Sequence, residues 1–135
     1  PLRGVYLTEL AKRLIREQNL KVVIIGGRDE LINDKELFSG IYDVNLINLA
    51  GKTTLVQLAA ILKRAKLLIS GDSGPVHLAG CVGTPVIAIF RNDIPGKSST
   101  RWGPLSKGSI VIEKNNLLEI SVDEVFNAIR KGLNI

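Results

Sequence analysis

The sequence predicts an α/β fold in which an open, parallel sheet carries helices on both faces. Short apolar runs rich in β-branched residues alternate along the chain with amphipathic segments, as strands and helices do in such folds. Several of these runs are apolar at every position, which is typical of strands buried on both faces of a parallel sheet. The chain has 135 residues, 45% hydrophobic and 23% charged, so it can bury the core of one domain.

Periodicity and helix-ending residues locate the elements. Helices are expected at residues 6–18, 53–65, 75–82 and 121–131, with a weaker candidate at 29–37. Strands are expected at residues 22–25, 66–70, 85–90 and 109–113, with a weaker candidate at 43–47. Pro75 and Gly83 suit the first turn and the end of a helix, and Ser121 and Glu124 have capping-box spacing. This order indicates a Rossmann-like sheet.

Three further expectations concern packing and loops. The strand at residues 22–25 should be internal and buried on both faces. The helix at 53–65 should bury an apolar stripe, which consists of Leu55, Leu58, Ala59 and Leu62. The polar stretch between residues 90 and 109 is long for a compact domain, and such loops are usually functional or mobile.

Composition excludes several classes of function. The single cysteine, Cys81, excludes an internal disulfide, and one histidine is too few for a Cys/His zinc site; we expect Cys81 to be packed. No apolar run approaches the roughly 20 residues that span a bilayer. The net charge of +5 is spread along the chain, and aromatics make up only 4%, which disfavours a nucleic-acid partner. A cytoplasmic protein without cofactor or metal is therefore predicted.

The strongest candidate site follows the strand at residues 66–70. Ligands of open α/β sheets bind beyond the carboxyl ends of the strands, where helix N-termini offer unpaired N–H groups and partial positive charge. Ser73 and Gly74 would therefore form a phosphate cradle, Asp72 would accept hydrogen bonds from sugar hydroxyls, and His77, one turn later, would donate to a phosphate oxygen. The alternative is that Asp72 and Ser73 are helix caps and His77 a surface residue.

Two other segments should lie at the same edge of the sheet. Lys52 and Thr53 enter the helix at 53–65 and can contact the nucleotide, unless Thr53 or Thr54 only caps that helix. Asp29 follows the strand at 22–25 and can accept hydrogen bonds from ribose hydroxyls, unless it is a solvated surface charge.

Two catalytic motifs are excluded. The segment GDSGP at residues 71–75 is similar to the nucleophile segment of trypsin-like proteases, but those are all-β, and here the only histidine lies one turn from the serine. The segment GKT at residues 51–53 is similar to part of a nucleotide phosphate loop. That motif requires a glycine five residues earlier, where this chain has Leu46.

The order of the segments resembles glycosyltransferase family 9, the heptosyltransferases. The resemblance lies in NLAGKTTL (48–55), LAAIL (58–62), AKLLISGDSGPVHLA (65–79) and GTPVIAIF (83–90), with RWGP (101–104) similar to a later family loop. It implies a two-domain GT-B enzyme that transfers heptose from an ADP-activated donor to the lipopolysaccharide inner core, usually without a catalytic metal. In this family the segment matching Asp72, Ser73, Gly74 and His77 contacts the donor.

The resemblance also implies that residues 1–135 form the C-terminal, donor-binding domain. The acceptor site and the general base would then belong to an N-terminal domain, so this chain alone should be inactive. The enzyme would be cytoplasmic, and a peripheral association with the inner membrane is an open alternative. A family donor domain would open with a strand before the helix at residue 6, and we expect this chain to begin after that strand. Direct pairing of the strands at 22–25 and 66–70, or insertion of another copy's element, is then favoured over a sheet that stays split. A noncatalytic module for a nucleotide or phosphometabolite is the alternative.

Overall fold

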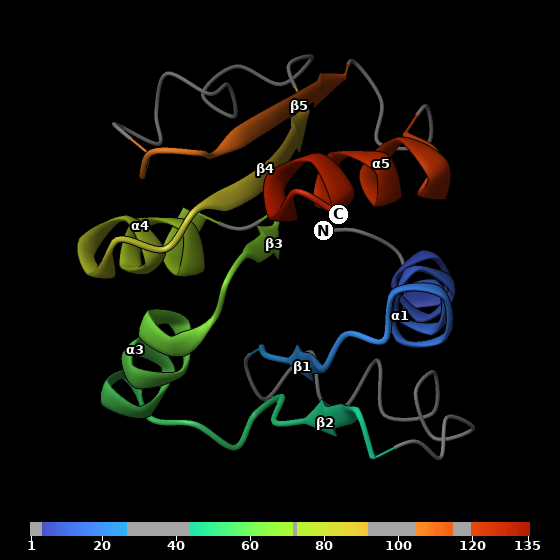
Figure 1. Ribbon diagram of the computed structural model, residues 1–135. Coiled ribbons are helices and arrows are strands. Elements are labelled where there is room, and N and C mark those ends of the chain that lie inside the picture. The colour runs from blue at the N-terminus through green and yellow to red at the C-terminus, as the bar shows by residue number, and fades with distance from the viewer. Residues whose placement is uncertain (1–3, 27–43, 72, 92–104, 115–119) are drawn as a thin grey trace. The chain divides into compact units, whose positions relative to one another are not determined.

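The computed structural model describes residues 4–26, 44–71, 73–91, 105–114 and 120–135 (Figure 1). The chain divides into two compact units, Leu2–Leu58 and Ala59–Ile135. Each unit contains its own parallel sheet, with two strands in the first unit and three in the second. The predicted alternation of helices and parallel strands is therefore confirmed in both.

The first unit contains α1 (Gly4–Gln18), β1 (Val22–Ile24) and β2 (Leu46–Asn48). The strands pair in parallel, and α1 packs on β1. The helix buries an apolar stripe, which includes Leu10, Ala11, Leu14 and Ile15. It ends at Gln18; Asn19 donates its N–H to the Ile15 carbonyl at 3.1 Å, and its φ of 54° turns the chain so that the N–H of Leu20 donates to the Leu14 carbonyl at 3.2 Å.

The prediction that β1 is buried on both faces is wrong. Val23 and Ile47 lie opposite each other in the register and are 37% and 38% exposed. One face of this two-stranded sheet is therefore partly accessible.

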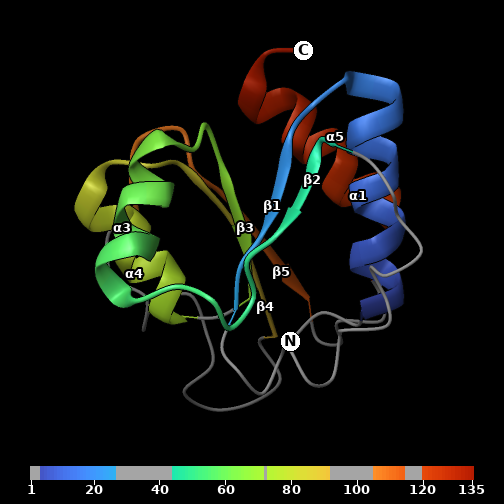
Figure 2. The same cartoon turned by 90° about the horizontal axis from the view of Figure 1, so that it is seen from below.

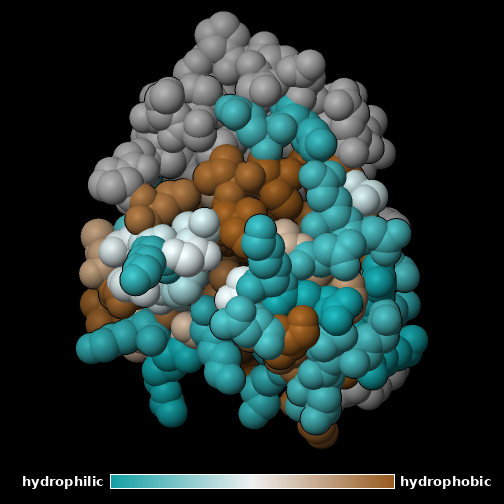
Figure 3. All heavy atoms as spheres, turned by 45° about the horizontal axis from the view of Figure 1, so that its top comes forward, coloured by the Kyte–Doolittle hydropathy of each residue, from teal (hydrophilic) through white to brown (hydrophobic). Residues whose placement is uncertain are grey.

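The second unit contains β3 (Leu68–Ser70), α4 (Ser73–Val82), β4 (Val86–Arg91), β5 (Ile110–Lys114) and α5 (Val122–Leu133). The strand order is β3-β4-β5, all parallel. The central strand, β4, is almost fully buried over its first four residues, as predicted. At the sheet edge, β5 leaves Val111 half-exposed, and Figure 3, which turns the β5 side of Figure 1 forward, shows apolar residues bordered by hydrophilic ones.

Hydrogen bonds fasten the amino ends of these strands to one another. The N–H of Leu68 donates to the Pro85 carbonyl at 3.0 Å, and that of Val86 donates to the Ser109 hydroxyl at 2.9 Å. Thr84 lies nearby and is buried, and its hydroxyl donates a hydrogen bond to the Leu62 carbonyl. Leu62 lies near the end of α3 (Leu55–Arg64), a helix that begins in the first unit and ends in the second. The unit is thus fixed at the end where its strands begin.

Several local predictions can be compared with the structure. The Ser121 side chain accepts from the N–H of Glu124, which confirms the cap of α5, and Gly83 ends α4 with a φ of 83°. Leu55 is 73% exposed, however, so the apolar stripe of α3 begins only at Leu58. Cys81 is exposed and free rather than packed, because the buried face of α4 is formed by Val76 and Ala79.

The expected direct pairing of the strands at 22–25 and 66–70 is not found. Among the described strands β1 pairs with β2, and β3 pairs with β4, so the two runs belong to separate sheets. The helix candidate at residues 29–37 lies outside the described residues. Within the described ranges, no helix has the length and apolar character needed to cross a membrane.

Candidate functional site

The site centres on the loop between β3 and α4. Since β3, β4 and β5 are parallel, their carboxyl ends share one edge of the sheet, and α4 begins at that edge. Figure 2 shows the strands lengthwise, with the start of β3 and the C-terminal end of α5 at the top of the second unit. The first turn of α4 therefore lies where ligands of open α/β sheets bind.

Gly71 fixes the path of the chain into this loop. It follows Ser70, whose register partner is Ala88 in β4. A Cβ added to Gly71 would lie 3.2 Å from the backbone oxygen of Ile89, tighter than nine in ten such contacts in proteins. Glycine therefore suits this position because the loop passes against the neighbouring strand, a reason that the sequence did not reveal.

Gly74 has the opposite environment. It is exposed, and a Cβ added there would meet no atom within 4 Å. Ser73 and Gly74 are the first two residues of α4, and their N–H groups belong to the turn that lacks intrahelical partners. Pro75 contributes no N–H, so these two backbone donors and the helix dipole make the N-terminus of α4 suitable for an anion.

The rest of α4 holds this turn in place. Val76 and Ala79 are fully buried, and the helix packs on β3 and β4. His77 lies between them in sequence but is exposed, one turn after Ser73. The helix thus keeps its N-terminus rigid and leaves the imidazole free to reach a ligand at that end.

In the first unit, the loop after β2 is tightly ordered by its own hydrogen bonds. The Asn48 side-chain oxygen accepts from the N–H of Ala50 at 3.0 Å, and Gly51, with a φ of 71°, donates to the Gly26 carbonyl at 2.8 Å. Lys52 is exposed and Thr53 half-buried at the end of this loop. Both are therefore presented just before α3.

The start of α3 is closed by a reciprocal pair of hydrogen bonds. The Thr54 hydroxyl accepts from the N–H of Gln57 at 3.1 Å, and the Gln57 side-chain oxygen accepts from the N–H of Thr54 at 2.9 Å. This is a capping box, so Thr54 is the cap, as one of the predicted alternatives held. The T-x-x-Q spacing would have revealed Gln57, which the sequence interpretation missed.

Some predicted residues cannot be compared. Asp72, Asp29 and the RWGP segment at 101–104 lie outside the described residues. No cluster of three metal-binding side chains occurs in the part of the chain that the structure describes. Of the predicted site, the structure groups Ser73, Gly74 and His77 on one helix, and it places Lys52 and Thr53 together on the loop of the other unit.

A family model, glycosyltransferase family 9 (heptosyltransferase), matches residues 5–124. The chain belongs to glycosyltransferase family 9. It is 36% identical over 123 residues to the lipopolysaccharide heptosyltransferase 3 of Escherichia coli K12, covering 90% of this chain and 35% of that protein. It is also 33% identical over 110 residues to the lipopolysaccharide core heptosyltransferase OpsX of Haemophilus influenzae, covering 62% of this chain and 30% of that protein. The family 9 chain thus spans about a third of these relatives' length.

Solved structures agree with this family assignment. The E. coli ADP-heptose lps heptosyltransferase II superposes with a TM-score of 0.81 and 26% identity, covering 98% of this chain and 41% of that one. The E. coli heptosyltransferase WaaC with ADP, at 23% identity, shares the fold with a TM-score of 0.77, covering 96% of this chain and 39% of that one. The predicted open, Rossmann-like fold of a GT-B heptosyltransferase is therefore confirmed.

Proposed function

We propose that this chain is the donor-binding domain of a glycosyltransferase that transfers heptose, or a related sugar, from a nucleotide-diphosphate donor to the lipopolysaccharide inner core. The observation that carries the proposal is the N-terminus of α4, which begins just after β3, where a Cβ added to Gly74 would meet no described atom within 4 Å. The lipopolysaccharide heptosyltransferases among its relatives support the choice of sugar and acceptor.

The chemistry explains why such a helix start is useful. When the bond between sugar and phosphate breaks, negative charge grows on the departing nucleoside diphosphate. Fixed N–H donors and a helix dipole stabilise that charge without having to reorganise during the reaction. In this proposal Ser73 and Gly74 hold the diphosphate through their backbone, and His77 donates a hydrogen bond to a phosphate oxygen.

The remaining site residues are assigned to the other parts of the donor. Asp72 would accept hydrogen bonds from sugar hydroxyls, because a carboxylate beside the anion site would repel a phosphate. Lys52, exposed before α3, and Thr53 would contact the nucleotide, and Asp29 would accept from the ribose hydroxyls. The N–H groups of Thr54 and Gln57 are already bound by each other's side chains, so neither is available to a ligand at the start of α3.

The acceptor and the general base are assigned to the N-terminal domain of a two-domain enzyme. The relatives are about three times as long as this chain, which leaves room for such a domain. Because orienting two substrates provides much of the barrier reduction, we expect no sugar transfer by residues 1–135 alone. Turnover of ADP-heptose by the purified chain, with contaminating enzyme excluded, would contradict this assignment. The enzyme would act in the cytoplasm, in peripheral contact with the inner membrane.

The test of donor binding is titration calorimetry of the purified chain with ADP, ADP-heptose and unrelated phosphates. A donor domain should bind the two ADP ligands more tightly than the other phosphates. The matched variant is Gly74→Val, which places a branched side chain where the backbone must approach the diphosphate. Equal affinity of wild type and variant would exclude the phosphate cradle, and a preference for an unrelated phosphometabolite would favour the noncatalytic binding module.

A further inference from the structure

Exposed basic side chains from several segments lie at the end of the second unit opposite the candidate site. All six are exposed; they are Lys63, Arg64, Lys66, Lys107, Arg130 and Lys131. We call this surface the basic face. Lys63 and Arg64 end α3, Lys66 precedes β3, Lys107 precedes β5, and Arg130 and Lys131 lie in the last turn of α5.

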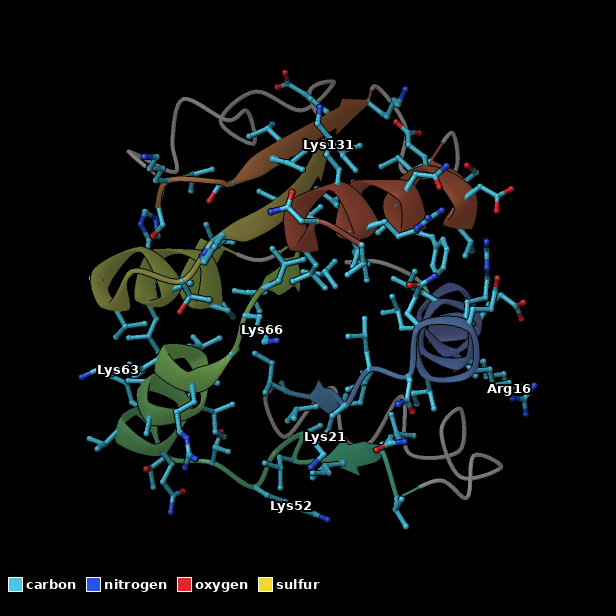
Figure 4. All side chains as sticks on the ribbon, in the orientation of Figure 1. Arg16, Lys21, Lys52, Lys63, Lys66 and Lys131 are labelled. Atoms are coloured by element: carbon cyan, nitrogen blue, oxygen red, sulfur yellow. The ribbon has the colours of Figure 1, made fainter. Side chains whose placement is uncertain are left out.

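Packing contacts bring these separate segments to one end of the sheet. A Cβ added to Gly132 in α5 would lie 3.7 Å from Leu67, the residue after Lys66. A Cβ on Gly108, the residue after Lys107, would lie 3.8 Å from Pro85, whose carbonyl binds the N–H of Leu68. Figure 4 shows Lys63, Lys66 and Lys131 apart from one another, coming from α3, the start of β3 and α5. The charges are therefore spread over a broad face.

The acidic side chains of this unit lie elsewhere. Among the residues described, the acidic ones are Glu113 at the end of β5 and Asp123 and Glu124 in the first turn of α5. These positions belong to the carboxyl edge of the sheet, where Glu124 is 3.5 Å from Lys114. Among the described residues, no ion pair neutralises a charge of the basic face.

Helix capping accounts for only part of this pattern. Basic residues in the last turn of a helix interact favourably with the dipole, which explains the pairs that end α3 and α5. Lys66 and Lys107, however, are in connecting segments, and α4 has no basic residue in its last turn. The basic face thus follows the end of the sheet, and not simply the helix ends.

We propose that the basic face docks the protein on a membrane surface that carries anionic phospholipids. Charge complementarity favours this partner, because separate exposed lysines and arginines without nearby acids add their attractions to a surface of negative headgroups. Nucleic acid is the less suitable polyanion, since the basic face has no aromatic residue on which bases could stack. The inference rests on the proposed peripheral role, and it leaves the start of α4 at the opposite edge accessible to a dissolved donor.

Vesicle cosedimentation tests this proposal with the whole chain. Wild type should bind vesicles of phosphatidylcholine mixed with phosphatidylglycerol, and not vesicles of phosphatidylcholine alone, with binding that weakens as salt rises. Each lysine near such a surface strengthens binding by about fivefold, so the triple variant Lys63→Ser, Lys66→Ser and Lys131→Ser should bind at least about tenfold more weakly. Circular dichroism should show the same fold for wild type and variant.

The matched control removes three positive charges of the first unit that have no ion pair among the described residues, in the variant Lys12→Ser, Arg16→Ser and Lys21→Ser, and should bind vesicles nearly as well as wild type. An equal loss of vesicle binding in the two variants would show that only net charge matters, and it would overturn the assignment of membrane binding to the basic face. Absence of vesicle binding by wild type would overturn the membrane contact, and tighter binding to a single-stranded oligonucleotide would assign the face to nucleic acid. ADP titration of the same samples reports separately on the donor site.

Discussion

The starts of α3 and α4 are similar in sequence and different in structure. Each follows a strand, a glycine and hydroxyl-bearing residues, and each lies just past the carboxyl end of its strand. At α3 the side chains of Thr54 and Gln57 bind each other's N–H groups, which completes the helix start. At α4, Gly74 is exposed, and among the described residues a Cβ added there would meet no atom within 4 Å. A helix start becomes a candidate ligand site where the chain's own side chains leave its donors available.

The largest effect is expected from Gly71→Ala. Its new Cβ would press on the Ile89 carbonyl oxygen from 3.2 Å, and Ile89 belongs to the buried central strand β4, which cannot easily move. We expect a loss of about 2 kcal/mol in the free energy of unfolding, which is typical of overpacking a tight site. Urea unfolding followed by circular dichroism measures this. A variant as stable as wild type would show that the loop is free to shift.

The second effect concerns the same loop but a different quantity. Gly74→Val should lower the affinity for ADP by at least about tenfold, because its side chain covers backbone donors. Its free energy of unfolding should differ from that of wild type by less than about 1 kcal/mol. The open space around Gly74 is the reason that the fold should tolerate the change. Gly74→Ala is the graded control. Its free energy of unfolding should exceed that of wild type by about 0.5–1 kcal/mol, and it should bind ADP with an affinity between those of wild type and Gly74→Val.

These two glycines also show what the sequence could and could not predict. The helix, the strand and the loop between them were predictable, because apolar periodicity and turn residues are local signals. The role of Gly71 was not, since it depends on the Ile89 carbonyl of a strand that begins 15 residues later in the chain. The exposure of Leu55 and of Cys81 was missed for a similar reason: helical spacing defines a face, and only tertiary packing decides which part of that face is covered.

The third effect tests the closed helix start. Thr54→Ala removes the hydroxyl that accepts from the N–H of Gln57, and loss of such a cap typically costs about 1 kcal/mol. ADP affinity should stay within about twofold of wild type, because the proposed diphosphate contacts are on α4 and not on α3. Thr54→Ser, which keeps the hydroxyl, is the control for stability. A large loss of ADP affinity in Thr54→Ala, reversed in Thr54→Ser, would move the phosphate site toward α3.

The smallest effect is expected from His77→Ala. The imidazole is exposed and lies one turn behind the backbone donors of Ser73 and Gly74, so it can add one hydrogen bond to a diphosphate that those donors already hold. Solvent competes for that bond, and a net contribution of about 0.5–1 kcal/mol corresponds to a two- to fivefold loss of ADP affinity. Unfolding should be nearly unchanged, because the buried residues of α4 are Val76 and Ala79. His77→Gln retains a side-chain N–H donor and should recover part of the affinity in calorimetry. If His77→Ala lost as much ADP affinity as Gly74→Val, the imidazole, and not the backbone at the helix start, would be the main anion contact. The difference between α3 and α4 in ligand binding would then depend on the His77 side chain.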